Sequence, residues 1–182
     1  MLDRCRRNMS TKLRKTSKYN TKMKKYTDMA IDEFDHRILD IVQNDNLRTH
    51  SEIAVEVNLS ASSVRRRLSK LRETGVIIGD VSLVDPAKQG LMFLVHVRLE
   101  VENQDGDEDF KKKISSDPAV SQCYSISGEF DYFLVVHSAS PEVHELWAER
   151  SLLSHPAVHR YSTSLVWSRT KFTTFIPQQS EM

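Results

Sequence analysis

The sequence predicts an α+β protein, with an N-terminal winged helix-turn-helix domain and a C-terminal ferredoxin-like βαββαβ domain. Two changes of pattern along the chain predict it. Between residues 31 and 79, apolar residues recur at the three- and four-residue spacing of amphipathic helices. From Gly90 onward they recur at every second position from Leu91 to Val101, the period of half-buried strands. A chain of 182 residues is long enough for two small domains, each with its own core.

These patterns divide the chain into five segments. The predicted boundaries are 1–30 for a disordered basic extension, 31–79 for the helix-turn-helix domain, 80–90 for a hinge strand or linker, 91–177 for the ferredoxin-like domain and 178–182 for a C-terminal tail. The extension carries ten Lys or Arg against two Asp, a net charge of +8, and has no hydrophobic period. We expect either an electrostatically active arm or a solvated tail. A further alternative to the active arm is a start codon assigned too early, with Met9, Met23 or Met29 as the true start.

The first predicted helix opens at Ile31, with Asp32 as its N-terminal cap. Its expected buried stripe consists of Phe34, Ile38, Ile41 and Val42. The polar segment 44–46 is the turn out of the helix.

The second predicted helix begins at a capping box, in which Thr49 and Glu52 satisfy each other's backbone amides. Its expected inward residues are Ile53, Ala54 and Val57. Asn58 suits the left-handed turn that follows, and Ser60 is the candidate cap of the third helix. Val64, Leu68 and Leu71 form that helix's apolar stripe, and Gly75 ends it.

The third helix has a cationic outer face. Ser62, Arg66, Ser69 and Lys70 gather opposite the apolar stripe, and Arg65, Arg67 and Arg72 flank them. Arginine reads guanine edges in the major groove and serine bonds several bases, so the pattern predicts duplex DNA binding. Ser62, Ser63 and Arg66 would reach bases, Arg65, Lys70 and Arg72 would hold phosphates, and Arg67 would brace the helix or contact phosphate. The alternative is an ordinary helical hairpin with a solvated face.

Beyond Gly75 the chain becomes extended, and Asp85-Pro86 ends the linker. A long strand is predicted from Leu91 to Val101, followed by an acidic loop over 103–109. A short helix with Phe110 and Ile114 inward precedes the second strand, over 120–127. The third strand is expected over 132–137.

A helix is predicted over 138–154, with Ser140 as its cap. Its expected buried face consists of Val143, Leu146 and Trp147. The fourth strand is predicted over 158–167, with a short fifth over 172–176. The order β-α-β-β-α-β is that of a ferredoxin-like sheet with two helices on one face. Both faces of the third strand are apolar, which predicts sheet-to-sheet dimerisation.

Several short motifs, in this order, carry a resemblance that covers about residues 31–177. They are Ile31-Asp32-x-x-Asp35 with Ile38-Leu39, Leu59-Ser60, Arg67-Leu68-x-x-Leu71, Gly75-Val76-Ile77-x-Gly79, Leu83-Val84-Asp85-Pro86, Gly128-Glu129-Phe130-Asp131-Tyr132 and Lys171-Phe172-Thr173-Thr174. With them the chain resembles the Lrp/AsnC, or feast/famine, regulators. The resemblance implies an amino-acid-sensing, oligomerising second domain, sheet-mediated homodimers that often form octamers, and a small effector, commonly an amino acid, held between dimers.

Carried over position by position, the resemblance places Gly128, Asp131 and Tyr132 in the effector loop and Thr163, Ser164 and Leu165 on the facing strand. Such a site is chemically reasonable, because a zwitterion needs a carboxylate for its ammonium and hydrogen-bond donors for its carboxylate. Glu129 stands where the family often has Asp. The structural alternative is a tight strand connection, with Gly128 present for its backbone dihedral.

Two other functions fit the predicted layout. Sirohaem decarboxylases resemble it, but their Arg-Arg-x-Gly segment would fall at Ile78-Gly79-Asp80-Val81, which has no arginine. The other is a sensing or assembly module without DNA binding. None of the seven histidines has catalytic or metal-ligand spacing, so we expect no catalytic residue, metal or cofactor. Cys5 and Cys123 form no motif, which predicts a reduced, cytoplasmic protein. No apolar run is long enough to span a membrane, so we expect no membrane partner.

Overall fold

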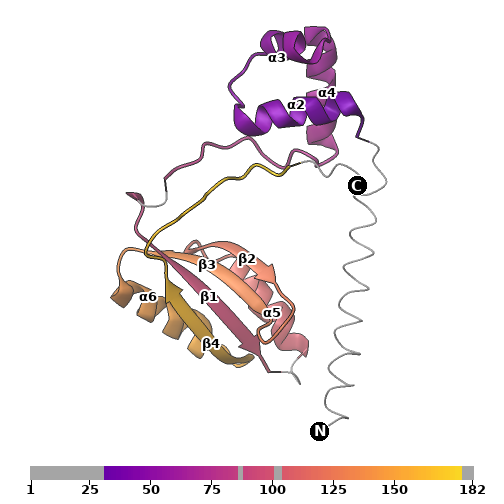
Figure 1. Cartoon of the computed structure of the whole chain (residues 1–182). Coiled ribbons are helices and arrows are strands. Elements are labelled where there is room, and N and C mark those ends of the chain that lie inside the picture. The colour runs from indigo at the N-terminus through magenta and orange to yellow at the C-terminus, as the bar shows by residue number, and fades with distance from the viewer. Residues whose placement is uncertain (1–30, 86–87, 101–103, 178–182) are drawn as a thin grey trace. The chain divides into compact units, whose positions relative to one another are not determined.

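The structure is a computed structural model that describes residues 31–85, 88–100 and 104–177 (Figure 1). The predicted basic extension, the tail from 178 on and Val101 lie outside the described residues. Contacts divide the chain into two compact units. Among the described residues, one unit comprises 31–81 and 173–177, and the other comprises those within Ser82–Phe172. We call them the helical unit and the sheet unit.

The helical unit contains α2 (Glu33–Asn44), α3 (His50–Val57) and α4 (Ala61–Glu73). Each helix begins at its predicted cap: Asp32 and Thr49 form reciprocal capping boxes, and the Ser60 hydroxyl accepts from the Ser63 amide. Asn58 adopts the left-handed conformation with φ 57°, which sets the turn between α3 and α4. The predicted helix-turn-helix is therefore confirmed.

The core of the helical unit lies where the three helices meet. Its buried residues are Ile38, Ile41, Ile53, Ala54, Val57, Val64 and Leu68. One predicted core residue was wrong, because Phe34 is 38% exposed. Asp35, one position along the helix, is buried instead, since its carboxylate is neutralised by an arginine of α4.

No helix or strand forms over residues 76–85, so the predicted hinge is an extended linker rather than a strand. The predicted fifth strand is also absent from the described residues 166–177. The described residues 173–177 lie with the helical unit, whereas the predicted second domain extends to residue 177. There the Ile176 amide donates to the Gln43 side chain (2.9 Å), and the Gln43 amide donates to the Ile176 carbonyl (3.3 Å).

The sheet unit has the predicted β-α-β-β-α-β order. Its elements are β1 (Leu91–Leu99), α5 (Gln104–Ser115), β2 (Val120–Ser125), β3 (Tyr132–Ser138), α6 (Pro141–Ala148) with the π-helical turn η2 (Glu149–Leu153), and β4 (Val158–Leu165). The four strands pair antiparallel in the order β2-β3-β1-β4, so β2 and β4 are the edges.

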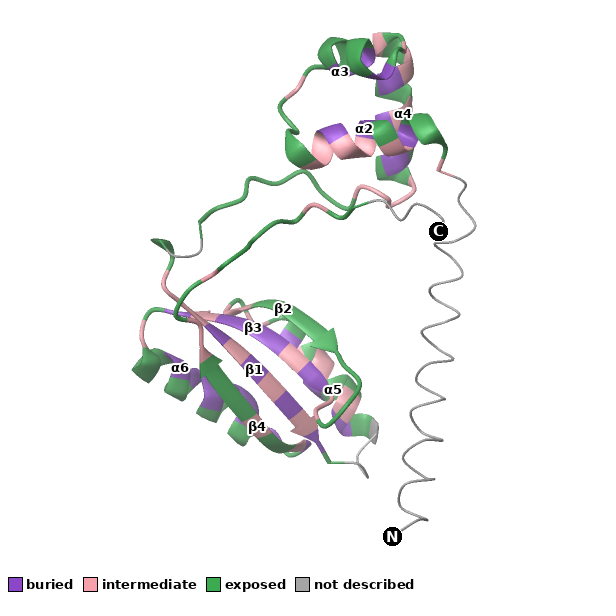
Figure 2. Ribbon diagram, in the orientation of Figure 1, coloured by how far each residue is buried: buried purple, intermediate pink, exposed green. Residues whose placement is uncertain are grey.

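One face of the sheet carries both helices. Alternate residues of β1 pack against Phe110 and Ile114 of α5 and against Trp147 of α6, and β1 shows this alternation of buried and intermediate residues in Figure 2. The opposite face, which we call the open face, has no covering element in the sheet unit's described residues. It presents Met92, Leu94, His96, Phe133, Val135 and His137, which face one another across β1 and β3.

Two predictions in this unit were wrong. The acidic segment expected as a loop forms the first turns of α5, where Asp105 and Asp107 are stabilised by the positive end of the helix. On α6, Val143 and Leu146 are 47% and 65% exposed, although Trp147 is buried as predicted. The buried face is rotated because His144 stacks flat on Phe93, with ring centroids 3.8 Å apart.

Candidate nucleic-acid interface and effector site

Helix α4 presents its polar side chains away from the core of the helical unit. Six of the eight predicted DNA-binding residues are exposed: Ser62, Arg65, Arg66, Ser69, Lys70 and Arg72. Ser63 and Arg67 are half-buried. The hydroxyl of Ser60 lies 3.0 Å from that of Ser62 and 2.8 Å from that of Ser63, so these serines are preorganised around the helix cap.

Arg67 braces α4 against α2. Its Nη1 donates to Asp32 Oδ2 and to Asp35 Oδ1, both at 2.7 Å, and its guanidinium lies 5.5 Å from the centre of the Phe34 ring. The pKa of Asp32 is lowered mainly by the hydrogen bond from the Asp35 amide and, to a smaller extent, by the contact with Arg67. Hydrogen bonds to the two carboxylates raise the pKa of Arg67. Of its two predicted roles, the structure shows the bracing role.

Arg72 is engaged close to the end of α4. Its Nε and Nη2 donate to the two oxygens of Asp80, at 2.9 and 3.3 Å. This two-pronged contact is the main reason why the pKa of Asp80 is lowered. Both side chains are about two-fifths exposed, so a DNA phosphate can replace the carboxylate at little cost.

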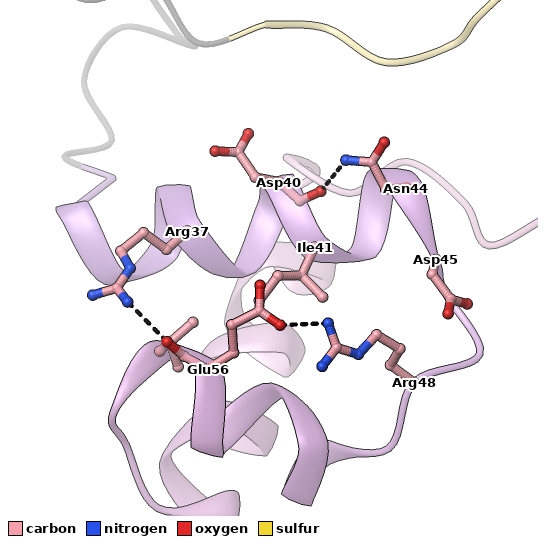
Figure 3. A pocket seen from close by; sticks show the side chains of 8 residues that line it. Arg37, Asp40, Ile41, Asn44, Asp45, Arg48 and Glu56 are labelled. Carbon is pink, nitrogen blue, oxygen red and sulfur yellow. Dashed lines mark hydrogen bonds and ion pairs between the residues drawn. The ribbon is translucent and has the colours of Figure 1, made fainter.

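The helical unit also has a shallow depression of about 600 Å³ that the sequence did not predict (Figure 3). Both of its arginines are already engaged within the helical unit. Arg48 pairs with the Glu56 carboxylate at 2.5 Å, and Arg37 donates to the Glu56 carbonyl at 2.8 Å. We therefore assign it no chemistry.

The predicted effector loop is held to β1 by Asp131. The Asp131 amide donates to the Val97 carbonyl (2.9 Å), and its Oδ2 accepts from the Leu99 amide (3.0 Å). Gly128 has φ +126°, a conformation that residues with a side chain rarely adopt. These contacts give the loop the structural role of a tight strand connection.

Tyr132 lies apart from the loop surface. It is 3% exposed and packs in the core beside Phe110, and its hydroxyl donates to Asp107 at 2.5 Å. Burial and this hydrogen bond raise the pKa of Tyr132. A side chain enclosed in this way supports the sheet and is not available to a ligand.

The predicted β4 residues do not meet the loop within one chain. Ser164 pairs with Leu94 on one side of β1, whereas Asp131 lies beside Arg98 on the other side. Leu94 and Arg98 are already about 13 Å apart along β1, so Ser164 and Asp131 are further apart than that. Thr163 and Leu165 pair with Val95 and Phe93, whose side chains face the helices, and only Ser164 shares the open face. A site combining both groups would need residues from two chains.

His144 is a buried histidine in contact with Thr163. It is 5% exposed, its Nε2 lies 3.4 Å from the Thr163 hydroxyl, and its Nδ1 is buried without a hydrogen-bond partner. Burial lowers the pKa of His144, because the charged ring would lose its hydration. The neutral form is therefore the one that the fold stabilises.

This burial predicts that acid destabilises the sheet unit. As the pH falls below about 6.5, the ordinary histidine value, the unfolded chain takes up a proton at residue 144 that the folded chain resists, so the free energy of unfolding decreases. Urea unfolding followed by tryptophan fluorescence, to which the buried Trp147 contributes, measures the effect at several pH values. In His144→Phe, which keeps an aromatic ring on Phe93, this part of the pH dependence should disappear. An unchanged pH profile would contradict the assignment.

The described residues contain no helix that is long and apolar enough to cross a membrane. Nor do they contain a cluster of three or more His, Cys, Asp or Glu side chains arranged to hold a metal ion.

Comparisons with known proteins agree with this division of the chain. Residues 31–78 match a family described as winged helix-turn-helix DNA-binding, and residues 92–176 match the Lrp/AsnC ligand binding domain. An uncharacterized HTH-type transcriptional regulator of Sinorhizobium fredii is 34% identical, over 82% of this chain and 89% of its own length. The leucine-responsive regulatory protein of Haemophilus influenzae is 28% identical, over 88% of this chain and 98% of its own.

Among solved structures, a transcriptional regulator of Neisseria meningitidis in complex with L-methionine superimposes with a TM-score of 0.76. It is 29% identical, and the match covers 81% of this chain and 97% of that one.

Proposed function

Since this chain belongs to the Lrp/AsnC family of DNA-binding transcriptional regulators, we propose that α4 reads its operator. We also propose that an amino acid bound by the sheet unit controls this DNA binding. The observation that supports DNA reading best is the outer face of α4. It exposes Arg65, Arg66 and Lys70, while Arg67 and the apolar stripe hold the helix from behind. In this reading Ser62, Ser63 and Arg66 contact bases.

The sharpest single test is Arg66→Ala. Arg66 is exposed at the middle of α4 and has no ion pair or side-chain hydrogen bond within the described residues, so its removal leaves the fold intact. Loss of a guanidinium from a base edge should weaken binding to the operator by about 1–3 kcal/mol. Fluorescence anisotropy with a labelled duplex taken from the upstream region of the protein's own gene measures this change.

Arg37→Ala is the matched control, because Arg37 lies on α2 in the same unit and donates to a backbone carbonyl of α3. It removes the same charge without touching the outer face of α4, and its operator affinity should stay near that of the wild type. Equal losses in the two variants would show that only overall charge matters, and would contradict base reading by α4.

The proposal for the assembly rests on the open face of the sheet. Its central apolar residues include Val135, which is only 8% exposed even without a covering element, and Leu94, which pairs with it. A face of this kind suits a second copy of the same chain, so we take the homodimer as the DNA-binding species, with octamers as a further step. The dimer would place two α4 helices on one duplex.

The effector proposal rests on the ligand-binding domain match and on the loop that begins at Gly128. An amino acid offers an ammonium for Asp131, whose Oδ2 already accepts one hydrogen bond, and a carboxylate for backbone amides near Gly128. Because Ser164 and Thr163 lie far from this loop in one chain, they would reach the ligand only from a neighbouring chain.

The same proposal makes the chain a regulator rather than an enzyme, acting in the cytoplasm on double-stranded DNA. Its buried histidines serve the fold: His144 stacks on Phe93, and His155 Nδ1 accepts from the Ala157 amide.

A further inference from the structure

The structure points to Arg98 and Arg160 as an anion-binding pair beside the Gly128 loop, and we propose that the effector is an amino acid with a side-chain carboxylate. The inference rests on the proposed effector function and specifies the class of ligand. Neither arginine was among the residues that the sequence suggested.

The two arginines lie directly opposite each other on neighbouring strands, Arg98 on β1 and Arg160 on β4. Val97 and Leu99 face the core, so Arg98 points to the open face between them. It lies four residues along β1 from Leu94, about 13 Å from the centre of the proposed dimer contact and at the end of the face beside the loop. Like charges placed opposite each other in antiparallel strands are unfavourable. Arg98 is half-buried and makes no ion pair or side-chain hydrogen bond with any residue that the structure describes. A bound carboxylate would relieve this repulsion.

Arg160 is oriented by its neighbours at the loop. Its guanidinium pairs with the Glu129 carboxylate and lies 5.1 Å from the centre of the Phe130 ring. The Phe130 ring is in turn 5.3 Å from that of His96, on the same face. Glu129 is 64% exposed, so a ligand carboxylate can displace it and take the planar, two-pronged contact that arginine favours.

The loop and Arg98 are held together in a single chain. Asp131 bonds to the backbone of both Val97 and Leu99, the residues on either side of Arg98. An amino acid at this loop would use Asp131 for its ammonium and the amides near Gly128 for its α-carboxylate. The two guanidinium groups then remain for a second carboxylate, which aliphatic and amide side chains lack.

The test is a ligand panel on the full chain, at an ionic strength matched with potassium chloride. L-glutamate and L-aspartate are compared with L-glutamine and L-asparagine, their uncharged counterparts, and with L-leucine and L-methionine. Only the acidic pair should raise the melting temperature strongly, because a ligand that binds the folded state stabilises it. In Arg98→Gln the calorimetric affinity for the acidic ligand should fall about ten- to hundredfold, the scale of one charge-assisted hydrogen bond.

Arg150→Gln is the control, since Arg150 is an exposed arginine on η2 of the same unit. It should bind as the wild type does. If the amides or the aliphatic amino acids bind as tightly as the acids, the acidic class is overturned while effector binding stands. If no amino acid binds although operator binding is intact, the effector function itself fails. If Arg98→Gln binds glutamate normally but changes the mass in solution, Arg98 is a subunit contact and the inference is wrong.

Discussion

Replacing Arg67 with methionine is expected to destabilise the helical unit by about 3–5 kcal/mol, the cost of leaving a buried charge without its partner. One Nη1 atom serves both Asp32 and Asp35, and the Asp35 side chain is only 9% exposed. Methionine keeps most of the volume and removes the charge, so the loss reports the ion pair rather than a cavity. The Asp32 side chain is half exposed, so water can solvate its charge once Arg67 is gone. We therefore expect a destabilisation toward the lower end of this range.

Hydrogen–deuterium exchange of α2 and α4 peptides measures this loss for the helical unit separately from the sheet unit. The second variant, Arg67→Met with Asp35→Asn, removes both charges and should recover part of the stability, as a double-mutant cycle requires for a coupled pair. If Arg67→Met left exchange unchanged and only weakened DNA binding, Arg67 would instead be a phosphate contact.

Operator binding is expected to weaken by about 10⁴ between 50 and 200 mM salt. A dimer that neutralises about eight phosphates releases their counterions, so log K should fall with log salt at a slope near −7. Arg65, Lys70 and Arg72 of each chain are the candidate phosphate contacts that the structure leaves on the outer face of α4. Anisotropy titrations at several salt concentrations give the slope directly.

The Arg65→Ala variant tests which residues produce this slope. Each chain of the dimer then loses one phosphate contact, so the slope should become shallower by about 2. A wild-type slope close to zero would contradict the regulator account, because sequence-independent phosphate contacts support every duplex-binding protein of this kind.

Local signals explain why the helical unit was predictable. The caps at Asp32, Thr49 and Ser60 depend on residues within three positions, and Asn58 needs only its own side chain to favour the left-handed turn. The partner of Arg67 could not be predicted in the same way. Asp35 lies 32 residues away, and only the packing of α4 on α2 brings the two together.

The sheet unit shows the same limit. The two-residue spacing of apolar residues predicted β1 and β3 well, because a strand with one face on the core buries every second side chain. The buried face of α6 was missed because Val143 and Leu146 are the more apolar residues, while the space beside Phe93 accepts the flat ring of His144. The effector residues were taken from a resemblance, and the strand register separates them in one chain and places Arg98 and Arg160 near the loop instead.

In the proposed function, the outer face of α4, braced by Arg67, reads base sequence. The most direct measurement is selection of duplexes from a random library by the wild type and by Arg66→Ala, followed by sequencing. The wild type should select a defined two-fold symmetric site, and the variant should select the same site with relaxed preference at one base pair in each half. Identical preferences in the two proteins, or no preferred sequence for the wild type, would contradict it.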